Sequence, residues 1–153
     1  MPKTHDNPGV IAPPPLLYFS GLIIGYALHW AIFWAPFQNL TAWGLGLVLA
    51  GFALAFWALY TMKQADTPVN PDRTPAHLVQ RGPYRWSRNP IYLAMTASSL
   101  GAAIALNNGW MAILLVVVLI AVQYGVIYRE ERYLSQKFGS DYQHYKTQVR
   151  RWL

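Results

Sequence analysis

The sequence predicts an all-α integral membrane protein with about four membrane-spanning helices. Two uncharged blocks lead to this prediction, because residues 16–62 and 89–128 contain no Asp, Glu, Lys or Arg. A spanning helix needs about 20 apolar residues, so blocks of 47 and 40 residues each hold two helices and a short turn. The composition agrees, since 12% of the 153 residues are charged, against roughly 25% in a typical soluble domain.

The four spans are expected in a single domain that covers residues 1–153, at about 16–34, 40–62, 91–106 and 110–128. Prolines 13–15 precede the first span, and two uncharged turns, at residues 36–39 and 107–109, close the helical pairs. The third span has some 16 residues, or about 24 Å at the helical rise. We therefore expect it to tilt little, to thin the bilayer, or to stop short of a full crossing.

The distribution of basic residues predicts the orientation. All 12 Lys and Arg lie in the N-terminal arm, in the loop at 63–88 or in the tail at 129–153, and the two short turns have none. Because Lys and Arg concentrate on the cytoplasmic side of membrane proteins, both termini and the loop should face the cytoplasm. The net charge of +6 is then a feature of a membrane protein, so nucleic acid is not an expected partner.

Small residues recur on the first two predicted spans. Gly21 and Gly25 form a GxxxG pattern, and Gly44, Gly46 and Gly51 follow on the second span. Such spacing is more typical of close helix packing in lipid than of contact with a cofactor. The chain has no Cys, which excludes a disulfide framework and a thiolate metal site or nucleophile, and no metal is expected.

Polar residues that could carry chemistry gather in the loop and the tail. Residues 81–92 read RGPYRWSRNPIY, in which Gly82 and Pro83 favour a turn and Pro90 suits the first turn of a helix. Three arginines and three aromatics here are also typical of an anchor for anionic lipids. Both interpretations stay open on these residues alone.

The tail begins with a pair of adjacent carboxylates, Glu130 and Glu131, directly after the fourth span. Carboxylates at a membrane edge are costly unless they are paired or used, so either an ion-pair cluster with the loop arginines or a functional site is expected. Apolar residues then recur every three or four positions, interrupted by Gly139. This amphipathic helix should lie along the inner interface or fold back over the loop.

Two segments together resemble a known family. LVQRGPYRWSRNPIYLA at 78–94 and EERYLSQKFGSDYQHYKTQVRR at 130–151 are similar to the isoprenylcysteine carboxyl methyltransferase family and its phospholipid methyltransferase relatives. The resemblance covers roughly the C-terminal half of the chain. It implies a membrane-embedded enzyme that takes a methyl group from S-adenosylmethionine, in a cytoplasmic-side pocket between the loop and the segment after the last span.

The resemblance also implies roles for individual residues. Glu130 would bind the amino group of the cofactor, and Gly82 would shape the loop. The other residues implied to bind S-adenosylmethionine are Leu78, Val79, Tyr84, Arg88, Asn89, Pro90, Ile91 and Tyr92. These types suit the cofactor, which carries a sulfonium, an ammonium, a carboxylate and a flat adenine.

The chain departs from the family pattern at two positions. Asn89 stands where many members have a histidine, and Val126 stands where the prenylcysteine enzymes place the arginine that meets the substrate carboxylate. Arg129 is the nearest substitute anchor for an anionic acceptor, although it lies on another face of the helix.

The leading functional hypothesis is an S-adenosylmethionine-dependent methyltransferase, similar to the isoprenylcysteine enzymes, whose acceptor is a lipid or another lipophilic small molecule. Phospholipid amine N-methylation is the alternative within the class. An amine must lose a proton before it attacks, so that alternative needs a base such as Glu131 or Tyr92. From another class, a non-catalytic four-helix membrane scaffold also fits the spans.

Overall fold

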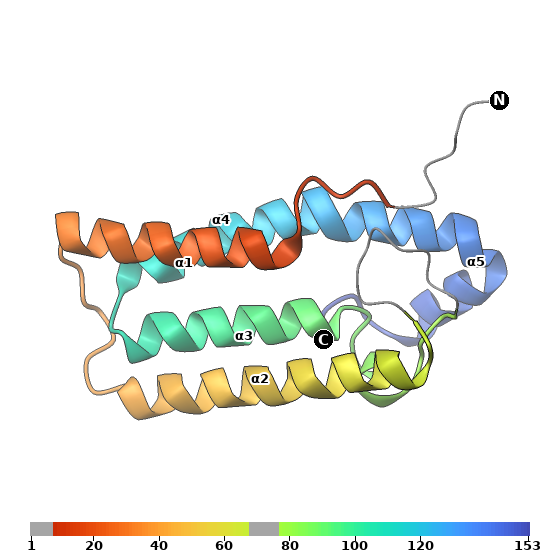
Figure 1. Ribbon diagram of the computed structural model, residues 1–153, viewed down its shortest axis with the longest axis horizontal. Helices are drawn as coiled ribbons and strands as arrows, with labels where there is room; N and C mark the ends of the chain where they lie inside the picture. The colour runs from red at the N-terminus through yellow and green to blue at the C-terminus, as the bar shows by residue number, and fades with distance from the viewer. Residues whose placement is uncertain (1–7, 68–76) are drawn as a thin grey trace.

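The computed structural model describes residues 8–67 and 77–153, and within these ranges every regular element is helical. Four helices run lengthwise beside one another (Figure 1): α1 (Pro14–Ala31), α2 (Thr41–Gln64), α3 (Pro90–Ala105) and α4 (Gly109–Val122). A π-helical turn, η2 (Gln123–Ile127), joins α4 to α5 (Tyr128–Gln148), and a 3₁₀ turn, η1 (Gly82–Arg85), precedes α3. The predicted all-helical fold is confirmed.

The first three predicted spans match α1, α2 and α3 to within three residues at each end, and the fourth is helical throughout but runs on through η2 into α5. In the described part of the chain, two helical segments are long and apolar enough to cross a membrane: α2, and the segment from Gly109 to Gln148. Helix α3 has 16 residues and is as short as the sequence suggested. That four helices cross the membrane stays a prediction.

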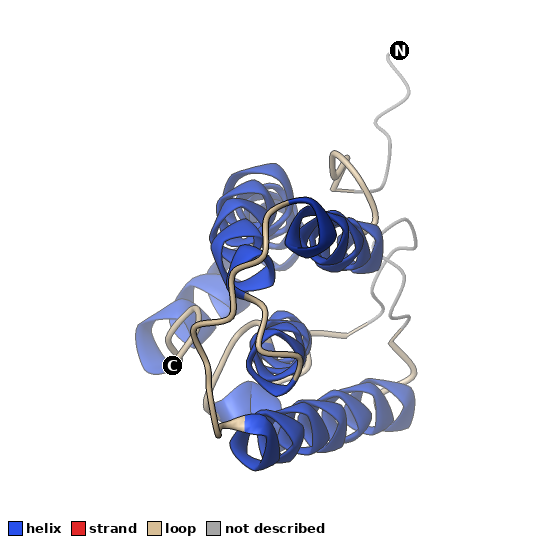
Figure 2. Cartoon of the chain, turned by 90° about the vertical axis from the view of Figure 1, so that its left-hand side faces the viewer, coloured by secondary structure: helices blue, strands red, loops and turns tan. Residues whose placement is uncertain are grey.

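Helix α3 lies between α2 and the pair formed by α1 and α4, as the end-on view in Figure 2 shows. Glycines permit the close approach of α2 to α3. A Cβ atom on Gly51 would lie 2.8 Å from the carbonyl oxygen of Ala94 and 2.9 Å from the amide nitrogen of Ser98. Gly44 meets the backbone of Ala105 in the same way.

The GxxxG pattern of α1 packs on α4. A Cβ atom on Gly25 would lie 2.7 Å from the Cα atom of Met111, and one on Gly21 would lie 2.8 Å from the side chain of Val118. These contacts agree with the packing role predicted for the small residues. Gly46 is the exception, because nothing lies within 4 Å of its Cβ position; it does not belong to the packed stripe.

One end of the bundle is closed by short connections, and the other end carries the longer segments. At the closed end Asn108 caps α4 by accepting a hydrogen bond from the amide of Met111 at 3.1 Å. At the opposite end the starts of α1 and α3 meet the ends of α2 and α4 (Figure 1). The loop before α3 and helix α5 extend from this second end.

Gly51 and Gly46 provide a matched test of the packing. Gly51→Leu should lower the free energy of unfolding in detergent by about 1–3 kcal/mol, the usual cost of overpacking, because its neighbours are backbone atoms of α3. Gly46→Leu places the same side chain in open space on the same helix and should change stability little. Equal unfolding curves for the two variants would contradict this packing.

Candidate active site

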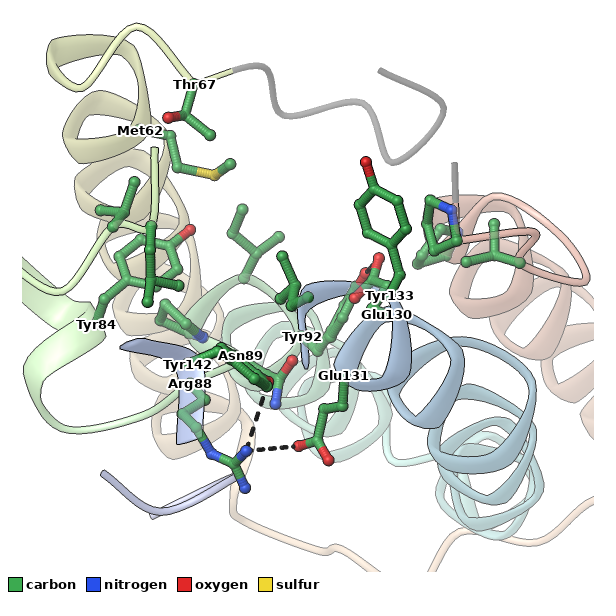
Figure 3. Close-up of a pocket in the computed structure, with 18 of the residues that line it drawn as sticks. Met62, Thr67, Tyr84, Arg88, Asn89, Tyr92, Glu130, Glu131, Tyr133 and Tyr142 are labelled. Carbon is green, nitrogen blue, oxygen red and sulfur yellow. Dashed lines mark hydrogen bonds and ion pairs between the residues drawn. The ribbon is translucent and has the colours of Figure 1, made fainter. Parts of the chain in front are cut away.

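A large pocket lies where the loop, α3 and α5 meet. Its volume is about 870 Å³, near the upper end of the roughly 300–1,000 Å³ that small-molecule sites occupy. Side chains from the loop and α3 face those of α5 across it (Figure 3). Ten of the residues predicted from the sequence line the pocket: Leu78, Val79, Tyr84, Arg88, Asn89, Pro90, Ile91, Tyr92, Glu130 and Glu131.

The loop reaches the pocket through a tight turn. Gly82 has a φ of +59°, which glycine adopts without the strain that a side chain brings, and a Cβ atom there would lie 2.7 Å from the hydroxyl of Thr61 on α2. The 3₁₀ turn that follows buries Tyr84, whose carbonyl oxygen accepts a hydrogen bond from the hydroxyl of Tyr145 at 2.6 Å. Burial raises the pKa of the Tyr84 hydroxyl, so it stays protonated.

Glu130 faces Tyr92, whose hydroxyl donates a hydrogen bond to Oε1 of Glu130 at 2.7 Å. No ion pair joins Glu130 to a cationic side chain of the described residues. Burial raises the pKa of Glu130 to about 7, the hydrogen bond from Tyr92 opposes that rise, and the charge of Glu131 adds to it. The pocket therefore holds a carboxylate that has no cationic partner in the part of the chain that the structure describes.

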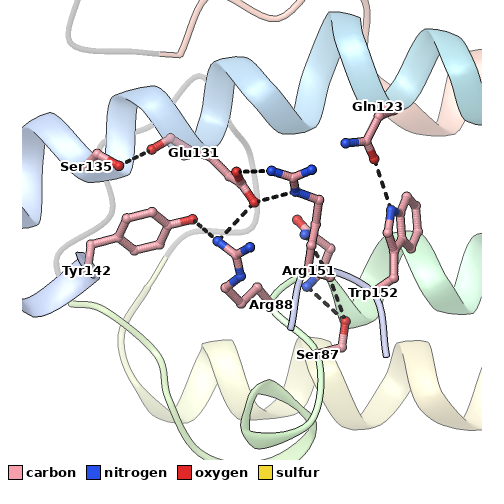
Figure 4. A network of polar contacts seen from close by, with 9 residues as sticks. Ser87, Arg88, Gln123, Glu131, Ser135, Tyr142, Arg151 and Trp152 are labelled. Atoms are coloured by element: carbon pink, nitrogen blue, oxygen red, sulfur yellow. Dashed lines mark hydrogen bonds and ion pairs between the residues drawn. The ribbon is translucent and has the colours of Figure 1, made fainter. Parts of the chain in front are cut away.

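Glu131 has the opposite environment, because two arginines neutralise it (Figure 4). Oε1 lies 3.0 Å from Nη1 of Arg88, and Arg151 binds both carboxylate oxygens at 2.8 Å. Arg88 also donates to the hydroxyl of Tyr142 at 3.5 Å, while its Nε atom is buried without a hydrogen-bond partner. A carboxylate held in this way is an anchor for the loop.

The tail folds back over the loop, which is one of the two arrangements expected for it. Gly139 turns the helix with a φ of +50°, and the chain after α5 then reaches the loop. The amide of Arg88 donates to the carbonyl of Arg150 at 3.0 Å, and Nδ2 of Asn89 donates to the carbonyl of Arg151 at 3.0 Å. The indole of Trp152 donates to Gln123 at 2.9 Å.

Arg129, predicted as a substitute anchor for the acceptor, does not line the pocket. Its side chain is exposed, and Nη1 donates a hydrogen bond to the carbonyl of Gly9 at 2.7 Å. It thus contacts the segment before α1. Its role as an anchor of an acceptor stays a prediction.

Sequence reasoning missed several residues of the site. The tail contributes Tyr142 and Tyr145 to the lining and Arg151 to the ion pairs. The segment before α1 contributes Val10 and Ile11. The repeated apolar spacing of the tail pointed to the two tyrosines, but no local pattern indicated the segment before α1.

Substitutions of Arg151 and of its neighbour Arg150 distinguish the effect of the ion pair from the effect of the positive charge of the tail. Arg151→Ala should reduce the free energy of unfolding by about 1.5–3 kcal/mol, the range for hydrogen bonds to charged groups, because Glu131 is left with Arg88 alone. Arg150→Ala removes an exposed side chain and keeps the backbone carbonyl that Arg88 contacts. If both variants unfold at the same denaturant concentration, Arg151 does not stabilise the site.

Comparison with known proteins finds one family match that contains the motif at 78–94 and the first half of the motif at 130–151. A family model described as phospholipid methyltransferase matches residues 40–141, from α2 into α5. An uncharacterized protein of Haemophilus influenzae is 35% identical over 63 residues, which are 41% of this chain and 100% of that protein. No solved structure matches the chain.

Proposed function

Because the chain belongs to the phospholipid methyltransferase family, we propose that it transfers a methyl group from S-adenosylmethionine to a lipophilic acceptor at the membrane. One observation carries the proposal: the pocket places Glu130 against Tyr92, and among the described residues that carboxylate has no cationic partner. The ammonium group of S-adenosylmethionine is the cation that this carboxylate would bind.

The remaining groups of the pocket also fit S-adenosylmethionine. Arg88, whose Nε atom is buried without a partner, and the amide of Asn89 suit the carboxylate of the cofactor. Tyr84, Ile91 and the apolar side chains of the loop supply walls for the adenosine. The bound cofactor supplies a methyl group on a sulfonium, and no metal is needed for its displacement. The residues contribute by aligning the reactants and excluding water.

Glu131 would contribute to catalysis by positioning the loop beside the pocket. Arg88 and Arg151 hold Glu131, and the same two arginines connect the loop to the tail. Both oxygens of Glu131 are occupied, which favours a positioning role over the role of a base. We place the pocket on the cytoplasmic side, from the distribution of Lys and Arg in the sequence.

The isoprenylcysteine-like and phospholipid reactions differ in the acceptor. Val126, which replaces the arginine of the prenylcysteine enzymes, is fully buried. This favours an acceptor without a carboxylate, so phospholipid amine N-methylation is the second candidate. The amine must lose a proton to another group, because Glu130 is assigned to the ammonium group of the cofactor that both reactions need. Mass spectrometry of the product from phosphatidylethanolamine or from N-acetyl-S-farnesylcysteine distinguishes the two reactions.

Removing the charge of Glu130 tests the cofactor assignment. Glu130→Gln keeps the size of the side chain and should weaken S-adenosylmethionine binding about 10- to 100-fold, as expected for a charge-assisted hydrogen bond worth about 1.5–3 kcal/mol. Isothermal titration calorimetry in detergent measures the Kd. Asp141→Asn removes an exposed carboxylate of the same helix and should leave the Kd unchanged; an unchanged Kd for Glu130→Gln argues against the assignment.

The raised pKa of Glu130 predicts a pH dependence. Below pH 7 the carboxyl group becomes neutral and loses its attraction for the ammonium group, so the Kd for S-adenosylmethionine should rise as the pH falls. The slope approaches about tenfold per pH unit between pH 7 and pH 5.5, because one proton is bound. Glu130→Gln should show a flat profile over this range, and a parallel slope in that variant would assign the titration to another group.

A further inference from the structure

The segment before α1, residues 8–13, lies against the junction of α4 and α5 (Figure 1), and we call it the strap. Two hydrogen bonds hold it there. The amide of Ile11 donates to the carbonyl of Gly125 at 3.2 Å, and Nη1 of Arg129 donates to the carbonyl of Gly9 at 2.7 Å. The strap is therefore bound to the helix that carries Glu130.

The seat of the strap depends on a glycine in the π-helical turn. A Cβ atom on Gly125 would overlap the side chain of Ile11 and lie 2.6 Å from its Cγ1 atom. Val10 packs beside Ile11 against the apolar cluster that includes Val126 and Ile127. The glycine in the turn thus leaves the space that the side chain of Ile11 occupies.

The strap forms an apolar wall of the pocket. Its side chains contribute together with Met95 of α3 and Leu134 of α5, and the strap contains no charged residue. In Figure 3 the strap, drawn in faint red, lies on the side of the pocket away from Met62 and Thr67. The polar groups assigned to the cofactor come from the loop, α3 and α5. The strap instead offers a surface for hydrocarbon.

We propose that the strap is the wall that contacts the methyl acceptor and that it determines which lipophilic molecules bind. This inference rests on the proposed function. A pocket of about 870 Å³ has room for a second reactant beside the cofactor, and an uncharged wall suits an acyl or prenyl chain. The strap also lies outside residues 40–141, which match the family. Its sequence can therefore differ from that of other family members and select a different acceptor.

Arg129 then acts as a positioning residue that holds the strap, and its effect on the acceptor is indirect. This role differs from that of a direct anchor for an anionic acceptor. Substituting a direct anchor would change acceptor binding without loosening the strap. Substituting a positioning residue changes both acceptor binding and the position of the strap. Any other substitution that displaces the strap then has the same effect on acceptor binding.

The position of the strap is measurable because the chain contains no cysteine. Val10→Cys introduces a single thiol, and its rate of alkylation by a water-soluble maleimide reports whether the strap is seated. Adding Arg129→Ala should increase that rate about three- to tenfold, in line with the loss of one hydrogen bond from an exposed side chain. Arg132→Ala, an exposed position on the same helix, is the control and should leave the rate unchanged.

The acceptor is tested with the total lipid extract of the expression host and labelled S-adenosylmethionine. In Arg129→Ala the apparent KM for the extract should rise about three- to tenfold, while kcat and the Kd for S-adenosylmethionine stay within twofold. Gly125→Val, which displaces Ile11 and leaves Arg129 in place, should raise the KM likewise.

Each result decides between the roles. A raised KM in Arg129→Ala alone, without faster alkylation, would make Arg129 a direct anchor and overturn the proposal. Faster alkylation with an unchanged KM would show that the strap does not contact the acceptor. No methyl transfer by the unaltered protein would remove the proposed function and the strap's role with it, whereas transfer that none of the variants changes removes the strap's role alone.

Discussion

The ion pairs of Glu131 with Arg88 and Arg151 connect three segments that are distant in the sequence: the loop before α3, the start of α5 and the end of the chain. Buried charges must be paired, because removing them from water is costly. The loop and the tail therefore close over the same carboxylate. The backbone amide of Arg88 and the side-chain amide of Asn89 donate hydrogen bonds to carbonyls of the tail, and these bonds follow from that closure.

The neighbouring carboxylate, Glu130, has different contacts because successive residues of a helix point about 100° apart. Glu131 is directed to the two arginines, and Glu130 is directed to Tyr92 and the pocket. The same short sequence thus supplies one neutralised carboxylate that supports the structure and one that is available to a cationic ligand. A π-helical turn ends at Ile127, shortly before this pair, and such turns are frequent at functional sites.

The sequence was sufficient to predict where the helices lie and which residues form much of the site. The absence of charge over residues 16–62 and 89–128 located the helices, since helix ends in these blocks coincide with turns of Pro, Asn and Gly. The loop motif and the carboxylate pair Glu130 and Glu131 identified ten residues that line one pocket. Both signals are local, because hydropathy and motif spacing are properties of short stretches of chain.

The rest of the site depends on contacts between distant segments, which local patterns do not encode. The return of the tail depends on the positive φ of Gly139 and on partners some 60 residues earlier, such as Ser87 for the carbonyl of Arg151. The strap depends on a match between Ile11 and Gly125. Arg129 was assigned to the acceptor from its place beside Glu130, whereas its side chain contacts Gly9.

The most direct test of the account is transfer of labelled methyl from S-adenosylmethionine into an organic-extractable product, by the purified protein in native lipids. The account predicts that the unaltered protein labels a lipophilic product and that Glu130→Gln reduces this labelling at a cofactor concentration near the Kd of the unaltered protein. Absence of label together with absence of cofactor binding would contradict it and favour a non-catalytic four-helix scaffold.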